Sequence, residues 1–129
     1  MATAEKKTVL VVEDNELNMR LFCDLLDAFG FQTLQCRDGA KAVELTRKHK
    51  PDLIIMDIQL PEVSGLDITR WLKDDDKVSH IPVLAVTAFA MRADEQRVRE
   101  AGCEGYLSKP IQIATFIKAV EALMPKEAA

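Results

Sequence analysis

Short apolar runs alternate with amphipathic segments five times along this chain, and this alternation limits the possible folds more than any other feature. Each run is followed by a segment with apolar residues at helical spacing. The runs occupy residues 8–13, 31–36, 52–57, 82–87 and 105–109. Strands that alternate with helices predict right-handed crossovers and a parallel sheet covered on both faces. Five units are too few for a closed eight-fold barrel, so we predict an α/β fold with an open, doubly wound sheet.

Two of the predicted helices carry an apolar stripe that we expect to face the core. In the first helix the stripe consists of Leu17, Leu21, Phe22, Leu25 and Phe29. In the last helix it consists of Ile113, Phe116, Ile117, Val120 and Met124. Asp38 is the expected N-cap of the second helix, which stops before Pro51.

Length and composition are those of one soluble globular domain. The chain has 129 residues, of which 48% are hydrophobic and 29% are charged. No apolar run approaches the roughly 20 residues of a membrane span, and the opening "MATAEKK" has no following apolar core of a signal peptide. We expect a cytoplasmic protein with one domain at residues 8–124, and disordered ends at residues 1–7 and 125–129.

Cysteine count and charge exclude several function classes. Three cysteines without C-x-x-C spacing argue against a disulfide framework and a zinc site. The formal net charge of -4 argues against direct nucleic-acid binding, which needs a basic surface to displace counterions.

Polar side chains follow four of the five predicted strands. The carboxyl ends of parallel strands meet at one edge of a sheet, where ligands of such folds bind, so these side chains should converge. They are Glu13, Asp14 and Asn15 after the first strand, Asp57 after the third, Thr87 after the fourth and Lys109 after the fifth.

The three carboxylates of Glu13, Asp14 and Asp57 would repel one another in one cleft, which raises the pKa of each unless positive charge lies beside them. Lys109 supplies one such charge, and a divalent cation would bring the local sum to zero. Oxygen ligands without His or Cys favour Mg²⁺, which keeps water ligands and works with phosphate. We therefore predict a Mg²⁺ site, with Mn²⁺ as a substitute.

Asp57 lies inside the apolar stretch "LIIMDIQL", where an isolated carboxylate is expensive to keep ionised. A metal ion, the Lys109 ammonium and the Thr87 hydroxyl would surround a phosphoryl group bound there. Asp57 is thus predicted to be a nucleophile that forms an aspartyl phosphate. The Lys109–Pro110 bond, between a strand and a helix, is a candidate cis peptide, although only about 5–6% of X-Pro bonds are cis.

Each of these residues also has a simpler explanation. Asp14 or Asn15 fits the N-cap of the first helix, Thr87 fits a cap or a β-branched strand residue, and Lys109 fits a surface lysine. Four such coincidences at the ends of four strands are much rarer than one, which favours a site.

Four segments resemble, in order and spacing, the receiver domains of two-component response regulators. They are "VLVVEDNELN", "PDLIIMDIQLPEVSGLDITRWLK", "IPVLAVTAFA" and "GCEGYLSKPI". The likeness covers residues 8–124 and implies a flavodoxin- and CheY-like sheet with strand order 2-1-3-4-5. It implies that Asp57 is the phosphoacceptor, that Lys109 bridges to the phosphoryl group, and that Mg²⁺ is bound by Asp14, Asp57, the Gln59 carbonyl and, through water, Glu13.

The resemblance also implies a switch and two contact surfaces. Thr87 would donate its hydroxyl to a phosphoryl oxygen, and Tyr106 would turn inward when Thr87 moves. The implied output surface comprises Phe89, Ala90, Met91 and Tyr106. Candidates for kinase docking are Leu17, Asn18 and Leu21, for which core packing is the competing interpretation.

By this resemblance the chain is a single-domain response regulator that accepts a phosphoryl group from a histidine kinase. No output segment follows Met124, so the signal is expected to leave through contacts with effector proteins. The expected partners are the dimerisation domains of histidine kinases or phosphatases, and the expected state is a monomer, with a dimer as the alternative. The segments "EDNELNM", "MDIQLPE" and "TAFAM" resemble single-domain members that act in cell-cycle and polarity signalling, which implies recruitment to a cell pole by partners.

Rival functions remain at this point. One is a receiver that only carries phosphoryl groups between other proteins, either alone or as part of a hybrid kinase. Another is a Mg²⁺-dependent aspartyl-phosphate phosphatase, whose second aspartate we would expect at the position of Gln59. A flavodoxin-like cofactor module shares the fold, but "EDNE" in the first loop would repel its anionic phosphate.

Overall fold

The computed structural model describes residues 7–88 and 92–124 and shows a five-stranded parallel sheet with the order β2-β1-β3-β4-β5. This confirms the predicted fold class and strand order. The strands are β1 (Thr8–Val12), β2 (Gln32–Cys36), β3 (Leu53–Asp57), β4 (Val83–Thr87) and β5 (Gly105–Ser108). Lys7, grouped by the sequence with the disordered N-terminus, accepts a backbone hydrogen bond from Gln32. Residues 1–6 and 125–129, also expected to be disordered, lie outside the described part.

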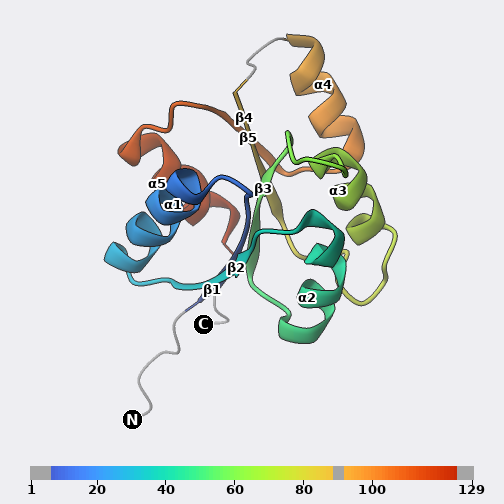
Figure 1. Ribbon diagram of the computed structural model, residues 1–129, viewed down its shortest axis with the longest axis horizontal. Coiled ribbons are helices and arrows are strands. Elements are labelled where there is room, and N and C mark those ends of the chain that lie inside the picture. The colour runs from blue at the N-terminus through green and yellow to red at the C-terminus, as the bar shows by residue number, and fades with distance from the viewer. Residues whose placement is uncertain (1–6, 89–91, 125–129) are drawn as a thin grey trace.

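Helices cover both faces of the sheet. They are α1 (Glu16–Ala28), α2 (Ala42–His49), α3 (Gly65–Lys73), α4 (Arg92–Ala101) and α5 (Ile113–Leu123). Figure 1 shows α1 and α5 on one face and α2, α3 and α4 on the other. The sheet therefore lies between two helical layers, as its nearly continuous apolar strands require.

Each strand supplies side chains alternately to the two layers. In β1, Val9 and Val11 join the core beneath α1 and α5, while Leu10 and Val12 join the core beneath α2, α3 and α4. The register places the end of β3 beside β4, with Asp57 opposite Val86. The carboxyl ends of β3 and β4 are thus held next to each other by two apolar cores.

Polar caps fix where the helices begin. The Asn15 side chain accepts a hydrogen bond from the Asn18 N–H and caps α1, and the Ser64 hydroxyl accepts from Leu66 N–H at the start of α3. Asp38 does act as a cap, but of a 3₁₀ turn at Gly39–Lys41 that precedes α2. Of the two proposed caps for α1, Asn15 is the one that the structure uses.

The apolar stripe predicted for α1 does not coincide with its buried face. Leu17, Leu21 and Phe29 are exposed by 80%, 42% and 53%, whereas the residues that face the core are Met19, Phe22, Cys23 and Leu26. The ring of Phe22 stacks on that of Phe116 from α5 at a centroid distance of 5.5 Å. The expected stripe mixed two neighbouring faces of the helix, because residues four apart drift around an α-helix of 3.6 residues per turn. Ile113, expected in the core, is likewise 54% exposed at the start of α5.

A glycine at the start of α3 allows the chain to pass close to the end of β3. A Cβ atom added at Gly65 would lie 2.2 Å from the carbonyl oxygen of Asp57, and the Gly65 N–H donates to the Ile58 carbonyl at 3.1 Å. Since the clashing atom is backbone, it can move only if the strand end moves. The close approach thus makes the position of Asp57 depend on Gly65.

We expect Gly65→Ala to lower the free energy of unfolding by about 3 kcal/mol, despite the higher helix propensity of alanine, because the strand end must shift. Urea denaturation followed by circular dichroism measures this loss. The matched control is Gly30→Ala. Gly30 has open space around it but a φ of +90°, so only the cost of the left-handed conformation, about 1 kcal/mol, should appear. Equal losses in the two variants would contradict the steric argument.

Candidate functional site

Four strand ends bring the polar residues together at one edge of the sheet. Glu13 directly follows β1, and its N–H donates to the Cys36 carbonyl at 3.0 Å. Asp57 and Thr87 are the last residues of β3 and β4. Lys109 directly follows β5, and its N–H donates to the Thr87 carbonyl at 2.7 Å. The convergence expected from the sequence is therefore present in the structure.

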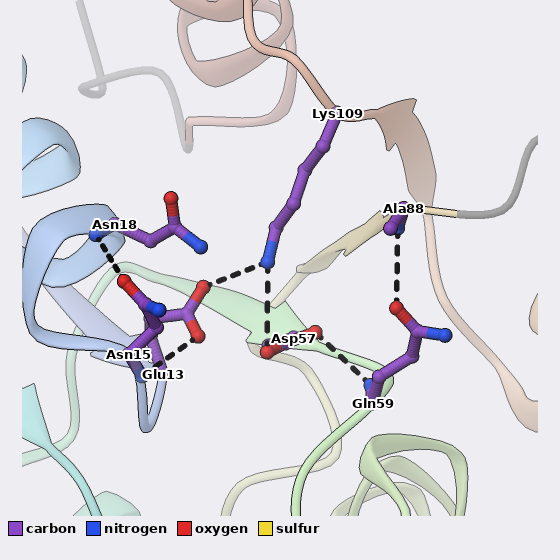
Figure 2. Close-up of polar contacts among 7 residues, drawn as sticks. All are labelled: Glu13, Asn15, Asn18, Asp57, Gln59, Ala88 and Lys109. Carbon is purple, nitrogen blue, oxygen red and sulfur yellow. Dashed lines mark hydrogen bonds and ion pairs between the residues drawn. The ribbon is translucent and has the colours of Figure 1, made fainter.

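The Lys109 ammonium lies between two buried carboxylates (Figure 2). Its Nζ is 3.0 Å from Glu13 Oε1 and 3.6 Å from Asp57 Oδ2. Glu13 is 1% exposed and Asp57 is 3% exposed, so neither carboxylate can rely on water for its solvation. Lys109 is thus a structural counter-ion, and the interpretation as an ordinary surface lysine is wrong.

One ammonium does not fully compensate the carboxylates. The pKa of Glu13 is raised from its ordinary value of 4.5 to about 7, first by burial and then by the hydrogen bond and charge of Asp57, against which Lys109 acts in the lowering direction. The site therefore carries a deficit of positive charge, which a proton or a cation can fill.

The carboxylates of Glu13, Asp14 and Asp57 form a group that could hold a metal ion. One oxygen from each residue lies within 4.8 Å of the others, and Asp14 is exposed while the other two are buried. Three carboxylate oxygens form a hard donor set with an opening to solvent, which suits a cation that keeps some of its waters. These residues fit the divalent cation that the sequence predicted.

Asp57 is also tied to the loop that follows it. The Gln59 N–H donates to Asp57 Oδ1 at 3.0 Å, and the Gln59 side-chain oxygen accepts from the Ala88 N–H at 3.4 Å (Figure 2). The Lys109–Pro110 peptide bond, a candidate cis peptide from the sequence, is cis. The contact between Gln59 and Ala88 has no sequence signal, because it joins a side chain to the backbone of a loop 29 residues away.

The remaining predicted residues lie around this centre. Thr87 is 2% exposed, and Tyr106 is half-buried against the core beneath α2, α3 and α4. Leu17 and Leu21 are exposed on α1, so the competing explanation that they pack in the core is wrong for both; Asn18 is half-buried. Phe89, Ala90 and Met91, expected on the output surface, lie outside the described residues.

Beside the acidic centre is a pocket of about 210 Å³ between α3 and α4. Gln59, Ser64, Thr87 and Arg97 contribute polar groups to its wall. Arg97 was not among the residues predicted for the site, because it comes from the middle of α4 rather than from the end of a strand. The pocket borders the end of β4 through Thr87.

Comparison with known proteins agrees with this geometry. Residues 9–121 match the family model of the response regulator receiver domain, so the chain belongs to this family. The polar-differentiation response regulator DivK of Brucella anthropi is 59% identical over 118 residues, which cover 92% of this chain and 96% of that relative. DivK of Brucella ovis is 58% identical over the same length. The chain is thus a receiver domain similar to DivK, a response regulator of two-component signalling.

Solved structures give the same fold. The receiver domain of the sensor histidine kinase PA1611 from Pseudomonas aeruginosa, which has a magnesium ion coordinated in its active-site cleft, matches with a TM-score of 0.85 and 28% identity over 92% of this chain and 98% of that one. The chemotaxis protein CheY4 of Vibrio cholerae matches with a TM-score of 0.88 and 22% identity, covering 93% of this chain and all of that one, which supports the fold alone.

Among the described helices, none has the length and apolar character needed to cross a membrane.

The raised pKa of Glu13 predicts how stability depends on pH in metal-free protein. Folded Glu13 binds a proton more tightly than unfolded Glu13, so its contribution to stability is present at low pH and is lost as the pH rises from about 4.5 to about 7. We expect Glu13→Gln to remove this contribution and to flatten the profile over that range. Urea denaturation at several pH values in EDTA measures it. A wild-type slope retained in full by the variant would contradict the assignment to Glu13.

Proposed function

We propose that this chain is a single-domain response regulator whose phosphoacceptor is Asp57. The observation that carries the proposal is the placement of this carboxylate, 3% exposed at the end of β3, beside the Lys109 ammonium and two further carboxylates. A carboxylate that is held in the interior beside an ammonium group is suited to act as a nucleophile. Membership of the receiver family supports the same role.

Asp14 and Asp57, with the Gln59 carbonyl and Glu13 through water, would hold Mg²⁺, or Mn²⁺ in its place. When bound, the cation supplies positive charge that the carboxylates lack and that phosphoryl oxygens require. Magnesium in the PA1611 receiver domain supports this choice, because that domain has the same fold.

The protein's own groups perform the transfer. An Asp57 oxygen forms a bond to phosphorus while the bond from phosphorus to the donor breaks, and the leaving group, imidazole or acetate, keeps the electron pair of that bond. The Lys109 ammonium, 3.6 Å from Asp57 Oδ2, is placed to stabilise the charge on the phosphoryl oxygens. The chain catalyses only its own phosphorylation and dephosphorylation, and in this sense it is not an enzyme.

Phosphorylation changes the charge of Asp57 from -1 to about -2 and adds three strong acceptor oxygens. The Thr87 hydroxyl would move toward them, and Tyr106, which packs against the core beneath α2, α3 and α4, would turn into the space that Thr87 leaves. A switch with states separated by a few kcal/mol is reversed by one new set of charge-assisted bonds. The altered surface at α4, β5 and α5, with residues 89–91 and Tyr106, is the proposed output.

The partners are the dimerisation domains of histidine kinases or phosphatases and downstream effectors. The relatives are named for polar differentiation, which supports a role in polarity or cell-cycle control, in the cytoplasm and with recruitment to a cell pole by partners. A role as an intermediate phosphotransfer carrier uses the same chemistry and differs only in the recipient of the phosphoryl group.

The acceptor assignment predicts one phosphoryl adduct. Incubation of the wild type with acetyl phosphate and Mg²⁺ should add the mass of one phosphoryl group, and Asp57→Asn should show none, because an amide is not a nucleophile here. Intact-mass spectrometry measures both. Asp67→Asn is the matched control, since Asp67 is an exposed residue of α3 paired with Arg70, and it should be labelled like the wild type. Labelling of Asp57→Asn equal to that of the wild type would refute the assignment.

The exposed residues of α1 predict that a substitution there affects phosphotransfer from a kinase but not phosphorylation by acetyl phosphate. Leu17→Ser should keep the wild-type rate with acetyl phosphate and lose about tenfold in phosphotransfer from a histidine kinase that phosphorylates the wild type, because one apolar contact is lost. Transfer of labelled phosphate measures the rate. Trp71→Ala is the control, since Trp71 is 51% exposed on the opposite face of the sheet and should not matter. Equal losses in both variants would contradict docking on α1.

A further inference from the structure

The peptide group between Thr87 and Ala88 is held at both of its ends, and the two hydrogen bonds differ in length. Its carbonyl accepts from the Lys109 N–H at 2.7 Å. Its N–H donates to the Gln59 side-chain oxygen at 3.4 Å. The first bond is short and joins the end of β4 to the residue that follows β5, whereas the second lies near the upper limit of hydrogen-bond length. The Ala88 end of this peptide is therefore held by a weak contact to one exposed side chain.

Gln59 forms hydrogen bonds both to the Asp57 carboxylate and to the Thr87–Ala88 peptide (Figure 2). Its backbone N–H donates to Asp57 Oδ1, and its side chain accepts from Ala88. A change at the Asp57 carboxylate and a change at the end of β4 thus both act on Gln59. Two sites that share one intermediate contact are energetically coupled when the contact exists in only one of two states.

The structure has room for the Gln59 side chain after its hydrogen bond with Ala88 breaks. Gln59 lines the pocket of about 210 Å³ that also borders Thr87 and Arg97. A glutamine amide that leaves Ala88 can turn within this pocket without displacing a core residue, because the pocket opens between α3 and α4. Release of the contact therefore requires no repacking of the apolar core.

We propose that the Gln59 side chain is a positioning group that holds the Thr87–Ala88 peptide in the orientation of the unphosphorylated protein. This inference rests on the proposed function and adds to it one residue that opposes the change to the active arrangement. When the end of β4 moves toward a phosphorylated Asp57, the hydrogen bond from Ala88 to Gln59 breaks first, because it is weaker than the bond from Lys109 to Thr87. Removal of the acceptor atom lowers the cost of that movement and shifts the population toward the active arrangement.

The expected effect is small and has a definite sign. One long hydrogen bond at an exposed residue contributes at the low end of the usual range, so its loss should strengthen binding of a phosphoryl analogue by about two- to fivefold. By reciprocity of coupling, the analogue should weaken the contact by the same factor. A residue that acts only in overall stability would not strengthen binding.

The test compares Gln59→Met with the wild type in equilibrium binding of beryllofluoride, a phosphoryl analogue, in the presence of Mg²⁺. Methionine has a similar length but lacks the oxygen acceptor, and the backbone of residue 59 is retained. Because beryllofluoride binding is measured at equilibrium, the result does not depend on how fast an aspartyl phosphate is hydrolysed. The matched control is Gln35→Met, the same chemical change on β2, where the amide donates to Cys23 Sγ far from the acidic centre.

Nuclear magnetic resonance of the Ala88 amide gives the second readout. In unphosphorylated Gln59→Met the Ala88 amide signal should shift toward that of a water-exposed amide, whereas in Gln59→Glu, which keeps an oxygen at the same position, it should stay near the wild-type signal. Tighter binding with a shifted Ala88 signal in Gln59→Met, and wild-type behaviour of Gln35→Met, is the expected result. Unchanged or weaker binding of Gln59→Met overturns the inference. If the wild type itself binds no beryllofluoride, the proposed function fails instead, so the two failures are distinguishable.

Discussion

The Lys109 ammonium between Glu13 and Asp57 is the interaction on which the site depends. Two carboxylates that are nearly free of solvent contact cannot stay ionised together without a cation, and removing one member of such a buried group leaves the others uncompensated. The three residues follow or end β1, β3 and β5, so this charge group exists only when strands from both halves of the chain are paired. Folding and assembly of the site are one event.

The apolar layers explain why the charges lie where they do. β1, β3 and β4 are buried on both faces by alternating side chains, so their ends can shift only if two cores shift with them. Gly65 adds a backbone restraint on the other side of Asp57, where no Cβ fits. A rigid support of this kind is what holds a carboxylate, an ammonium and a hydroxyl within reach of one small ligand.

The fold and the grouping of polar residues at one edge of the sheet could be predicted from the sequence, for one physical reason. A parallel sheet with βα units places the ends of its strands at one edge, so polar residues after apolar runs identify the site before any distance is known. The same reasoning failed on α1, because periodicity alone could not tell Leu17, on an exposed face, from Met19, on the buried one. It also could not find the Gln59 side-chain contact, which depends on the path of two loops rather than on a residue pattern.

The contact lengths in the resting site divide into two groups. The bonds that fix the framework are short: 3.0 Å from Lys109 to Glu13, 3.0 Å from Gln59 N–H to Asp57, and 2.7 Å from Lys109 N–H to Thr87. The contacts that a phosphoryl group on Asp57 would replace are long, at 3.6 Å from Lys109 to Asp57 and 3.4 Å from Ala88 to Gln59. Because short, well-aligned bonds resist change more than long ones, added charge at Asp57 would reorganise the second group and leave the first in place. A site built in this way can change state without unfolding, since the parts that must move are the parts held most weakly.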